Sequence, residues 1–503
     1  MKSNKKSAKP IMVQGTSSHV GKSILTAALC RILRDRGFKV APFKAQNMAL
    51  NSSVTADGSE IGRAQAFQAE AAGVPPTFDM NPILLKPTGD SLSQVIIHGK
   101  VVGVMSARQY HAFKQEAKKF VLESYSRLAE NYDVIVIEGA GSPAEINLRE
   151  NDIANMGVAE LVDSPVILAG DIDRGGVFAS IVGTMELLTE DERERVKGFI
   201  INKFRGDINL LTPGIEFLEK RTNRPVLGVV PYMKDIILPD EDGVALESRS
   251  RKMGSLRISV IKLPRISNFT DFDPFKCEDD VELDFIDTPQ ELHGSHMVII
   301  PGTKNTLEDA KWMKDKGFFR ALGDFSGGGG VVWGICGGFQ ILGKKILDPF
   351  GVESDLKQMD GVGLLDTVTT MMKEKNTFQV TATVQVEGRE CLVQGYEIHM
   401  GETSGNALPF STILKRNSLE ASVKDGAISK DGNIIGTYIH GIFDNDGLRK
   451  NILDRLKRKN GFENNGLAKS YAAQKEASFK AVADIVENSL RIDELLNIIG
   501  VQF

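Results

Sequence analysis

Short apolar runs alternate with amphipathic stretches along the first half of the chain. Continuous apolar runs, typical of strands buried on both faces of a parallel sheet, occur at residues 11–14, 134–137, 165–169, 198–201 and 225–230. Helical periodicity covers residues 24–33, 61–72 and 106–131. Strands that alternate with helices in this way predict an α/β domain with a doubly wound, mostly parallel sheet.

A second series of apolar runs follows a polar, charged stretch at residues 239–255. Its strand-like members are residues 256–263, 296–300, 331–333, 381–386, 395–399 and 434–439, and the pattern beyond residue 448 is largely helical. We therefore expect an N-terminal domain at 1–247, a linker at 248–255, a second α/β domain at 256–443 and a C-terminal helical segment at 444–503.

The composition is that of an ordinary soluble protein, with 42% hydrophobic and 25% charged residues. A net charge of −5 argues against a general nucleic-acid binder. The four cysteines form no C-x-x-C pair, which excludes the usual zinc and disulfide patterns and suits a reducing cytosol; they are Cys30, Cys277, Cys336 and Cys391. Since no apolar run approaches a membrane span or a signal sequence, we expect a cytoplasmic protein that binds no membrane.

One cysteine stands at a sharp transition between a strand-like and a helix-like pattern. The sequence there is Gly334-Ile335-Cys336-Gly337-Gly338. Glycines on both sides permit a strained turn that lifts a nucleophile out of a sheet, as in the G-x-S-x-G elbow with sulfur in place of oxygen. The N-terminus of the following helix favours a thiolate. The alternative interpretation is a small buried residue in a glycine-rich turn.

His440 is the favoured base for Cys336 among seven histidines. It ends an apolar strand in the same domain and precedes a glycine, so both side chains can reach one sheet edge. A purely structural histidine is the alternative. Gly302, at another strand end, and Gly337 are candidates for the backbone N–H groups of an oxyanion hole.

A strand, a glycine-rich loop and a helix near the N-terminus predict a phosphate-binding loop. The loop reads Gly15-Thr16-Ser17-Ser18-His19-Val20-Gly21-Lys22-Ser23, with five residues between Gly15 and Gly21 instead of the usual four. Its backbone N–H groups can cradle phosphate, Lys22 supplies a positive charge and the Ser23 hydroxyl can bind Mg²⁺. We therefore expect a bound nucleotide at Gly15, Thr16, Gly21, Lys22 and Ser23.

Two polar segments follow predicted strands of the same sheet. Lys44 begins one of them, and Glu138 begins the other, Glu138-Gly139-Ala140-Gly141. An open α/β sheet binds its ligand at this edge, and a carboxylate there is well placed for Mg²⁺ beside the phosphates. A solvated loop is the alternative for the segment after Lys44.

These motifs resemble known families. The second half of the chain resembles a class I glutamine amidotransferase domain, which has a flavodoxin-like fold, in Cys336 with its glycines, in Gly302 and in His440. The N-terminal half is similar to dethiobiotin synthetase. Several longer stretches are similar to the cobyric acid synthase family: residues 44–52, 61–65, 138–148 (EGAGSPAEINL), 152–157 (DIANMG), 170–179 (GDIDRGGVFA), 201–207 (INKFRGD), 264–274 (PRISNFTDFDP) and 395–401 (GYEIHMG). The resemblance runs from about residue 11 to 443 and does not extend to the tail.

The resemblance implies ATP- and glutamine-dependent amidation of the b, d, e and g carboxylates of the corrinoid adenosylcobyrinic acid a,c-diamide. It also implies that Asp57 joins Ser23 and Glu138 around Mg²⁺, that Lys44 steadies the substrate carboxylate and that Asn202 recognises adenine. Five basic residues are candidates for a patch that receives the anionic corrinoid, with solvated surface charge as the alternative: Lys44, Arg63, Lys86, Arg174 and Arg205.

Two other functions stay open at this point. One is cobyrinic acid a,c-diamide synthase, which amidates different carboxylates of the corrinoid. The other is a P-loop regulatory protein with an inert amidotransferase-like domain. The sequence also leaves open the order of the amidations, the ammonia route, the corrinoid-binding residues, the role of the tail and whether the chain forms a homo-oligomer.

The position that usually carries an orienting glutamate, two residues after the histidine, is Ile442. We therefore expect Cys336 and His440 to act as a dyad without an essential third carboxylate, since cysteine needs less help from its base than serine does. The carboxylates nearest in sequence that could replace the glutamate are Asp444, Glu397 and Glu402.

Overall fold

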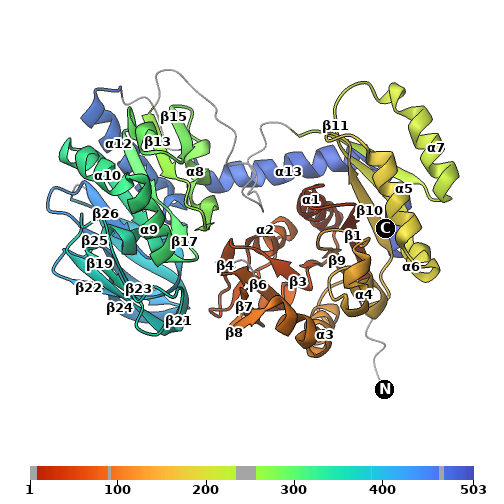
Figure 1. Cartoon of the computed structure of the whole chain (residues 1–503). Helices are drawn as coiled ribbons and strands as arrows, with labels where there is room; N and C mark the ends of the chain where they lie inside the picture. Colours follow the sequence, from red (N-terminus) through yellow and green to blue (C-terminus); the bar gives the residue numbers. More distant parts are fainter. Residues whose placement is uncertain (1–7, 89–91, 234–255, 387, 464–468, 503) are drawn as a thin grey trace.

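The computed structural model describes residues 8–88, 92–233, 256–386, 388–463 and 469–502. It contains two α/β domains that follow one another along the chain (Figure 1), so the predicted fold class is confirmed. The predicted linker at 248–255 lies outside the described residues. Of the helices in the described ranges, none combines the length and apolarity needed to cross a lipid bilayer.

The first domain is built on a six-stranded parallel sheet in the order β12-β11-β10-β1-β9-β2. Its strands are β1 (Lys9–Gly15), β2 (Val40–Phe43), β9 (Val134–Glu138), β10 (Val166–Asp171), β11 (Val196–Phe204) and β12 (Val226–Pro231). Nearly every residue of β1, β2, β9 and β10 is buried, as continuous apolar runs predict. Helices cover both faces, which makes the sheet doubly wound.

One face of this sheet packs against α3 (Ala107–Ala129), α4 (Met156–Leu161), α5 (Val177–Leu187) and α7 (Thr212–Thr222). The other face packs against α1 (Lys22–Asp35), which α2 (Arg63–Ala72) flanks, and against two helices from the far end of the chain, α13 (Tyr471–Ser489) and α14 (Ile492–Ile499). The short α6 (Glu190–Arg195) precedes β11. Both faces are therefore sealed only when the C-terminal segment is in place.

The apolar pattern did not predict the mostly antiparallel insertion that follows β2. Its main sheet has the order β3-β6-β7-β8, with β3 (Gln46–Met48), β6 (Ile83–Pro87), β7 (Leu92–Ile97) and β8 (Lys100–Ser106). The strands β4 (Ser52–Val54) and β5 (Glu60–Gly62) form a separate hairpin. The strands are short, and several of their polar residues are buried, so their sequences lack a clear alternation.

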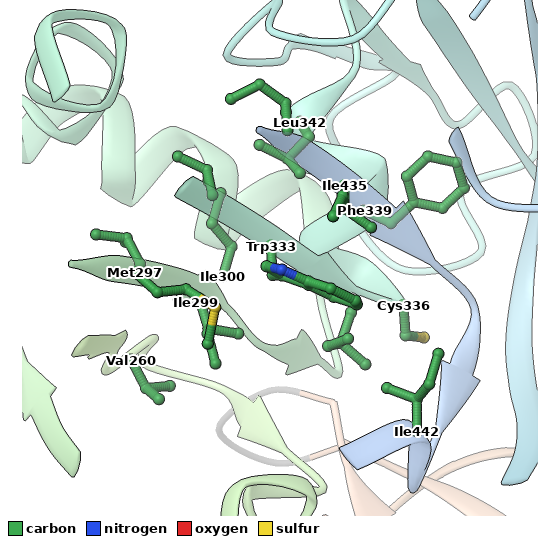
Figure 2. Close-up of a cluster of buried hydrophobic side chains, with 14 of the residues drawn as sticks. Val260, Met297, Ile299, Ile300, Trp333, Cys336, Phe339, Leu342, Ile435 and Ile442 are labelled. Atoms are coloured by element: carbon green, nitrogen blue, oxygen red, sulfur yellow. The ribbon is translucent and has the colours of Figure 1, made fainter. Parts of the chain in front are cut away.

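The second domain has a mostly parallel sheet in the order β15-β13-β16-β18-β26-β25. Its strands are β13 (Leu256–Ile261), β15 (Val281–Ile286), β16 (Met297–Ile300), β18 (Val331–Ile335), β25 (Ala427–Ile428) and β26 (Ile434–Thr437). Its helices include α8 (Asp273–Lys276), α9 (Thr306–Lys316), α10 (Phe318–Gly327) and α11 (Gly337–Leu342). Trp333 is buried at its centre among Val260, Ile299 and Ile442, with Cys336 at the margin (Figure 2).

A second, mostly antiparallel sheet extends this domain in the order β20-β19-β21-β22-β27, with β23 paired to β21 and β24 paired to β23. The strands are β19 (Lys345–Leu347), β20 (Gln358–Asp360), β21 (Thr367–Val386), β22 (Arg389–Gly405), β23 (Ser411–Arg416), β24 (Leu419–Asp425) and β27 (Ile439–His440). A two-stranded ribbon pairs β14 (Ile266–Ser267) with β17 (Gly302–Thr303). The sheet brings β27 and β22 side by side at the cysteine turn.

The C-terminal helices divide between the domains. Helix α12 (Asp446–Asn460) packs on the second domain, whereas α13 runs from there to the first domain (Figure 1). Gly228 of β12 pairs with Leu490, and a Cβ on Gly228 would lie 2.1 Å from the Ser489 carbonyl oxygen. This close approach requires glycine and fixes the end of α13 against the first sheet.

Candidate active sites

Cys336 lies in a strained turn between β18 and α11. Its backbone has φ 51° and ψ −108°, a left-handed conformation that a non-glycine residue adopts only when its surroundings impose it. The neighbouring glycines are required by close packing: a Cβ on Gly338 would lie 1.9 Å from the Ile300 carbonyl oxygen, and one on Gly334 would lie 2.6 Å from the Gly338 backbone. The geometry is that of a nucleophile elbow.

His440 shares a cavity with Cys336. Both side chains line it, together with Gly337, Thr303 and Asn268. The His440 imidazole is buried and stacks against the Tyr396 ring, with centroids 5.2 Å apart. Its position on β27, hydrogen-bonded to β22, delivers it from across the domain to the elbow.

Asp271 holds the other side of this imidazole. Its Oδ2 lies 2.6 Å from His440 Nδ1, and its Oδ1 accepts a hydrogen bond of 3.0 Å from the Gly441 N–H. Burial alone would lower the pKa of His440, but the Asp271 charge and the contact with Cys336 outweigh it and raise this pKa to about 10. The arrangement therefore favours a protonated His440 beside Cys336.

The sequence predicted a dyad without an essential third carboxylate, but the structure places a third carboxylate, that of Asp271, against His440. Asp271 occupies the orienting position, whereas Glu397 instead pairs with Arg416 at 2.8 Å and Glu402 is exposed. Asp271 lies in the 264–274 motif, which was noted only as a family resemblance. The acidic residues of this motif, which stand beside apolar ones, were the sequence signal for such a site. The motif is far from His440 in the sequence, so the pairing of Asp271 with His440 could not be predicted from it.

The candidate oxyanion-hole residues flank the same cavity. Gly337 is the first residue of α11 and lines the cavity beside Cys336. Gly302 lies against His440: a Cβ at this position would be 3.1 Å from Cε1 of the imidazole. The ribbon of β14 and β17 holds Gly302 opposite Ser267. Both glycines are thus close to the reacting side chains.

The phosphate loop joins β1 to α1 as predicted from the sequence. Gly21 has φ 96°, and a Cβ there would lie 2.3 Å from the Asn202 amide nitrogen. The Lys22 ammonium donates to the carbonyl oxygens of Ser17 and Gly141 at 3.0 and 3.1 Å. Asn202 donates to the Val20 carbonyl oxygen at 2.7 Å, which places this residue on the loop itself.

Glu138 is the centre of a buried polar cluster at the end of this loop. Its Oε1 accepts hydrogen bonds from Ser23 Oγ at 2.8 Å and from the Lys44 ammonium at 2.9 Å. Its Oε2 accepts from Gln68 at 2.5 Å and from Gln65 at 3.5 Å. Lys44 and Glu138 form a buried ion pair, so the loss of one charge would destabilise the other charge in the interior.

The 152–157 motif supports the loop that follows Glu138. The Asn155 side chain accepts from the Ala140 N–H at 3.1 Å and donates to the Ala140 carbonyl oxygen at 2.6 Å. Asp152 in turn accepts from the N–H groups of Asn155 and Gly157 at 2.9 and 2.8 Å. These bonds fix the Gly141 carbonyl that Lys22 contacts.

Both halves of the chain match known families. Residues 11–245 match the model of the CobQ/CobB/MinD/ParA nucleotide binding domain, and residues 257–448 match that of the CobB/CobQ-like glutamine amidotransferase domain. The cobyric acid synthase of Clostridium botulinum (strain 657 / Type Ba4) is 50% identical over 494 residues, which cover 98% of this chain and 99% of that protein. The chain belongs to the cobyric acid synthase family.

Two further members of the cobyric acid synthase family show the same end-to-end similarity. That of Syntrophobacter fumaroxidans is 47% identical over 509 residues, covering 98% of this chain and 99% of that protein. That of Sorangium cellulosum is 50% identical over 512 residues, covering 97% and 98%. The similarity includes the C-terminal helices, to which the sequence motifs did not extend.

Within this family member, Asp57 lies apart from the phosphate loop. Its carboxylate accepts hydrogen bonds from Thr55 and Ser59 in the turn of the β4–β5 hairpin. The same turn lies against Asn417 of the second domain, close to the Gly58 backbone. The structure therefore does not bring Asp57 to Ser23 and Glu138, because the unpredicted hairpin carries it away.

Residues of the expected basic patch lie in different surroundings. Lys86 is buried against Glu60 at the domain interface, and Lys44 is buried against Glu138. Arg205 is exposed, pairs with Asp173 at 2.7 Å and lies over the Tyr232 ring. Lys44, Lys86 and Arg205 hence do not form one surface.

The hairpin and the insertion make direct contact with the amidotransferase domain. The Ser52 N–H donates to Asn268 Oδ1 at 2.9 Å, and the Tyr396 hydroxyl donates to the Ser52 carbonyl oxygen at 3.2 Å. Asn268 lines the Cys336 cavity and Tyr396 stacks on His440. The first domain thus reaches the margin of the second domain's site.

Proposed function

We propose that the chain uses ATP and glutamine to amidate the b, d, e and g carboxylates of adenosylcobyrinic acid a,c-diamide, which yields adenosylcobyric acid for cobalamin biosynthesis. The observation that carries this proposal is the presence of both sites in a chain that aligns with cobyric acid synthases over almost its whole length. A cytoplasmic location suits this chemistry, because ATP and glutamine are available there.

Ammonia would be released in the second domain. The Cys336 thiolate attacks the side-chain amide carbon of glutamine, and the N–H groups of Gly302 and Gly337 stabilise the negative oxygen that develops. His440 gives its proton to the departing nitrogen, and Asp271 holds the imidazole in position. Ammonia leaves, and water then hydrolyses the thioester to glutamate and frees the thiol.

The carboxylate would be activated in the first domain. Its oxygen attacks the γ-phosphorus of ATP, ADP leaves and an acyl phosphate remains. Lys22 and the loop N–H groups hold the phosphates, Asn202 faces the adenine, and Lys44 can move from Glu138 to the substrate carboxylate. Ammonia then attacks the acyl carbon, and phosphate leaves as the amide forms.

Mg²⁺ would bind between Ser23 and Glu138. Their oxygens lie 2.8 Å apart at the end of the phosphate loop, and oxygen is the ligand that Mg²⁺ prefers. Within the described residues, no cluster of three or more His, Cys, Asp or Glu side chains is arranged to hold a metal ion. Mg²⁺ in such sites keeps water and phosphate ligands, and when bound it neutralises charge on the phosphates.

Mass analysis of the corrinoid product tests the proposal. Incubation with ATP and glutamine should add four amides to the a,c-diamide, each with the same fixed mass change. If cobyrinic acid itself gained two amides instead, the chain would be the a,c-diamide synthase. If neither substrate changed while the protein stayed folded, the P-loop regulatory alternative would replace the proposal.

A further inference from the structure

The cavity that contains Cys336 and His440 also contains four charged side chains that the chemistry above does not use. They are Lys86, Lys304, Glu353 and Lys375. Three of them belong to the second domain, but Lys86 comes from β6 in the insertion of the first domain. The first domain therefore supplies part of the wall of the glutaminase cavity.

Lys86 is held in place by buried partners. Its ammonium donates to Ser52 Oγ and to Glu60 Oε1, both at 2.8 Å, and its side chain is 5% exposed. Lys375 binds the other oxygen of Glu60 across the domain interface. This pairing positions both ammonium groups at the cavity.

Gln94 connects the third lysine to the same group. Its Oε1 accepts hydrogen bonds from Lys304 at 3.3 Å and from Lys375 at 3.4 Å. Lys304 follows the Gly302–Thr303 strand, and it lies close enough to Cys336 for the two charges to interact. The lysines thus form a continuous wall that extends from the nucleophile to the first domain.

The charges of this wall do not balance. Three lysines face Glu60 and Glu353, which leaves one positive charge in excess when all five groups are ionised. Burial lowers the pKa of Lys375 to about 7. The charges of Lys86 and Lys304 also lower this pKa, whereas the charge of Glu60 raises it. An anion that entered the cavity would relieve this repulsion.

Glutamine brings such an anion. Its side-chain amide must reach Cys336, and only the short carbon chain of the side chain separates this amide from the α-carboxylate and α-ammonium. Both charged groups therefore have to lie in the same cavity as the thiol. Buried carboxylates need charge-assisted hydrogen bonds, which lysines supply.

We propose that this wall binds the amino-acid head group of glutamine, with Lys86, Lys304 and Lys375 facing the α-carboxylate and Glu353 accepting from the α-ammonium. The inference rests on the proposed function, because it requires glutamine as substrate. Its new element is Lys86: the synthetase domain completes the glutamine site, so glutamine is recognised fully only when the two domains are docked.

The test compares two substrates of the glutaminase reaction in the full-length protein. L-Glutaminamide carries a neutral amide in place of the α-carboxylate, and its side-chain hydrolysis is followed by chromatography of the product. The wild type should prefer L-glutamine in kcat/KM by about tenfold to a hundredfold, the usual range for hydrogen bonds to a charged group. Equal use of the two substrates by the wild type would overturn the inference.

Lys86→Met should reduce this preference at least about threefold, mainly by raising KM for L-glutamine. The matched control is Lys100→Met, which changes an exposed lysine on β8 of the same insertion and should keep the wild-type preference. A folded Lys86→Met protein with an unchanged preference would refute the role of Lys86. If that variant does not fold, Lys86→Gln, which removes the charge but can still donate hydrogen bonds to Ser52 and Glu60, is measured in its place against the same two outcomes.

These measurements do not involve the corrinoid. A protein that discriminates between the two substrates but yields no amidated corrinoid would contradict the proposed function and leave the head-group inference intact. A protein that amidates the corrinoid but uses L-glutamine and L-glutaminamide equally would support the proposed function and contradict the head-group inference.

Discussion

Asp271 and His440 are 169 residues apart in the chain, yet their side chains meet at 2.6 Å in the interior of the second domain. The aspartate also accepts a hydrogen bond from the Gly441 N–H, so two bonds fix its orientation toward the imidazole. This geometry leaves the second ring nitrogen of His440 to serve Cys336. The three side chains gathered at this candidate site, Cys336, His440 and Asp271, therefore come from three separate parts of the domain.

Asp271→Asn should reduce glutamine hydrolysis about 10²- to 10⁴-fold, where the upper figure is the cost of the equivalent change in a serine triad. The amide cannot stabilise a protonated His440 as the carboxylate does. Steady-state glutaminase kinetics would measure the effect. Glu402→Gln is the control, since Glu402 is exposed, and it should be nearly silent. Activity of Asp271→Asn close to the wild type would restore the dyad.

The pH dependence of glutamine hydrolysis should report the raised pKa of His440. The departing nitrogen takes its proton from the charged imidazole, so activity is lost when this group deprotonates. With a pKa of about 10, the loss should occur as the pH rises toward 10, well above the ordinary value of 6.5. In Asp271→Asn the alkaline fall should move to lower pH, because the charge that raises the pKa is gone. An alkaline fall near pH 6.5 in the wild type would contradict the assignment.

Cys336→Ser should abolish glutamine-dependent synthesis and retain synthesis from added ammonium salt. In the proposed mechanism the thiolate serves only to release ammonia, and the acyl phosphate forms in the other domain. Corrinoid amidation with each nitrogen source would be measured on one preparation. Equal loss with both sources in a folded protein would show that Cys336 has another role.

Lys22→Ala should abolish corrinoid amidation with either nitrogen source, by at least about 10²-fold, since it removes a positive charge from the transferring phosphate. The measurement is ADP release together with the mass of the corrinoid. Lys39→Ala, at an exposed position before β2, is the control. Robust synthesis by the Lys22 variant would refute the nucleotide assignment.

Val486→Ala should lower the free energy of unfolding of the first domain by about 2 kcal/mol. Val486 is fully buried on α13, in the core that this helix shares with α1 and β12. Urea unfolding monitored by circular dichroism would measure the change. Lys480→Ala, on the exposed side of the same helix, should change the free energy of unfolding much less than Val486→Ala does. Equal stability of the two variants would mean that α13 contributes little to this core.

The sequence predicted those parts of the fold whose signals are local. Continuous apolar runs predicted the parallel strands. The phosphate loop and the cysteine turn were predicted because Lys22 and Cys336 each stand between a strand pattern and a helix pattern. The insertion after β2 was missed because its short strands bury polar residues such as Ser52 and Glu60. These residues satisfy partners across the domain interface, which no local pattern reveals.

The site was predicted to the same extent. Cys336 and His440 each end a strand, so a local pattern marks them. Asp271 lies in a short 3₁₀ helix, Phe269–Phe272, and Lys86 lies in a strand of the insertion, and neither setting indicates a site. Their positions follow from contacts over 169 residues in one case and from the docking of two domains in the other. The predicted place of Asp57 beside Ser23 and Glu138 was missed for a similar reason, since the β4–β5 hairpin that carries Asp57 was not predicted.

The packing of α13 and α14 on the first sheet has a consequence for synthesis on the ribosome. The second domain draws its described core from residues 256–462, whereas the core around α1 includes Val482, Leu490 and Ile499 near the end of the chain. Domains generally fold in order of emergence. Here one apolar face of the N-terminal half stays only partly covered until residues 471–499 have been made, which is after the whole described core of the second domain, so the amidotransferase half reaches its final form first.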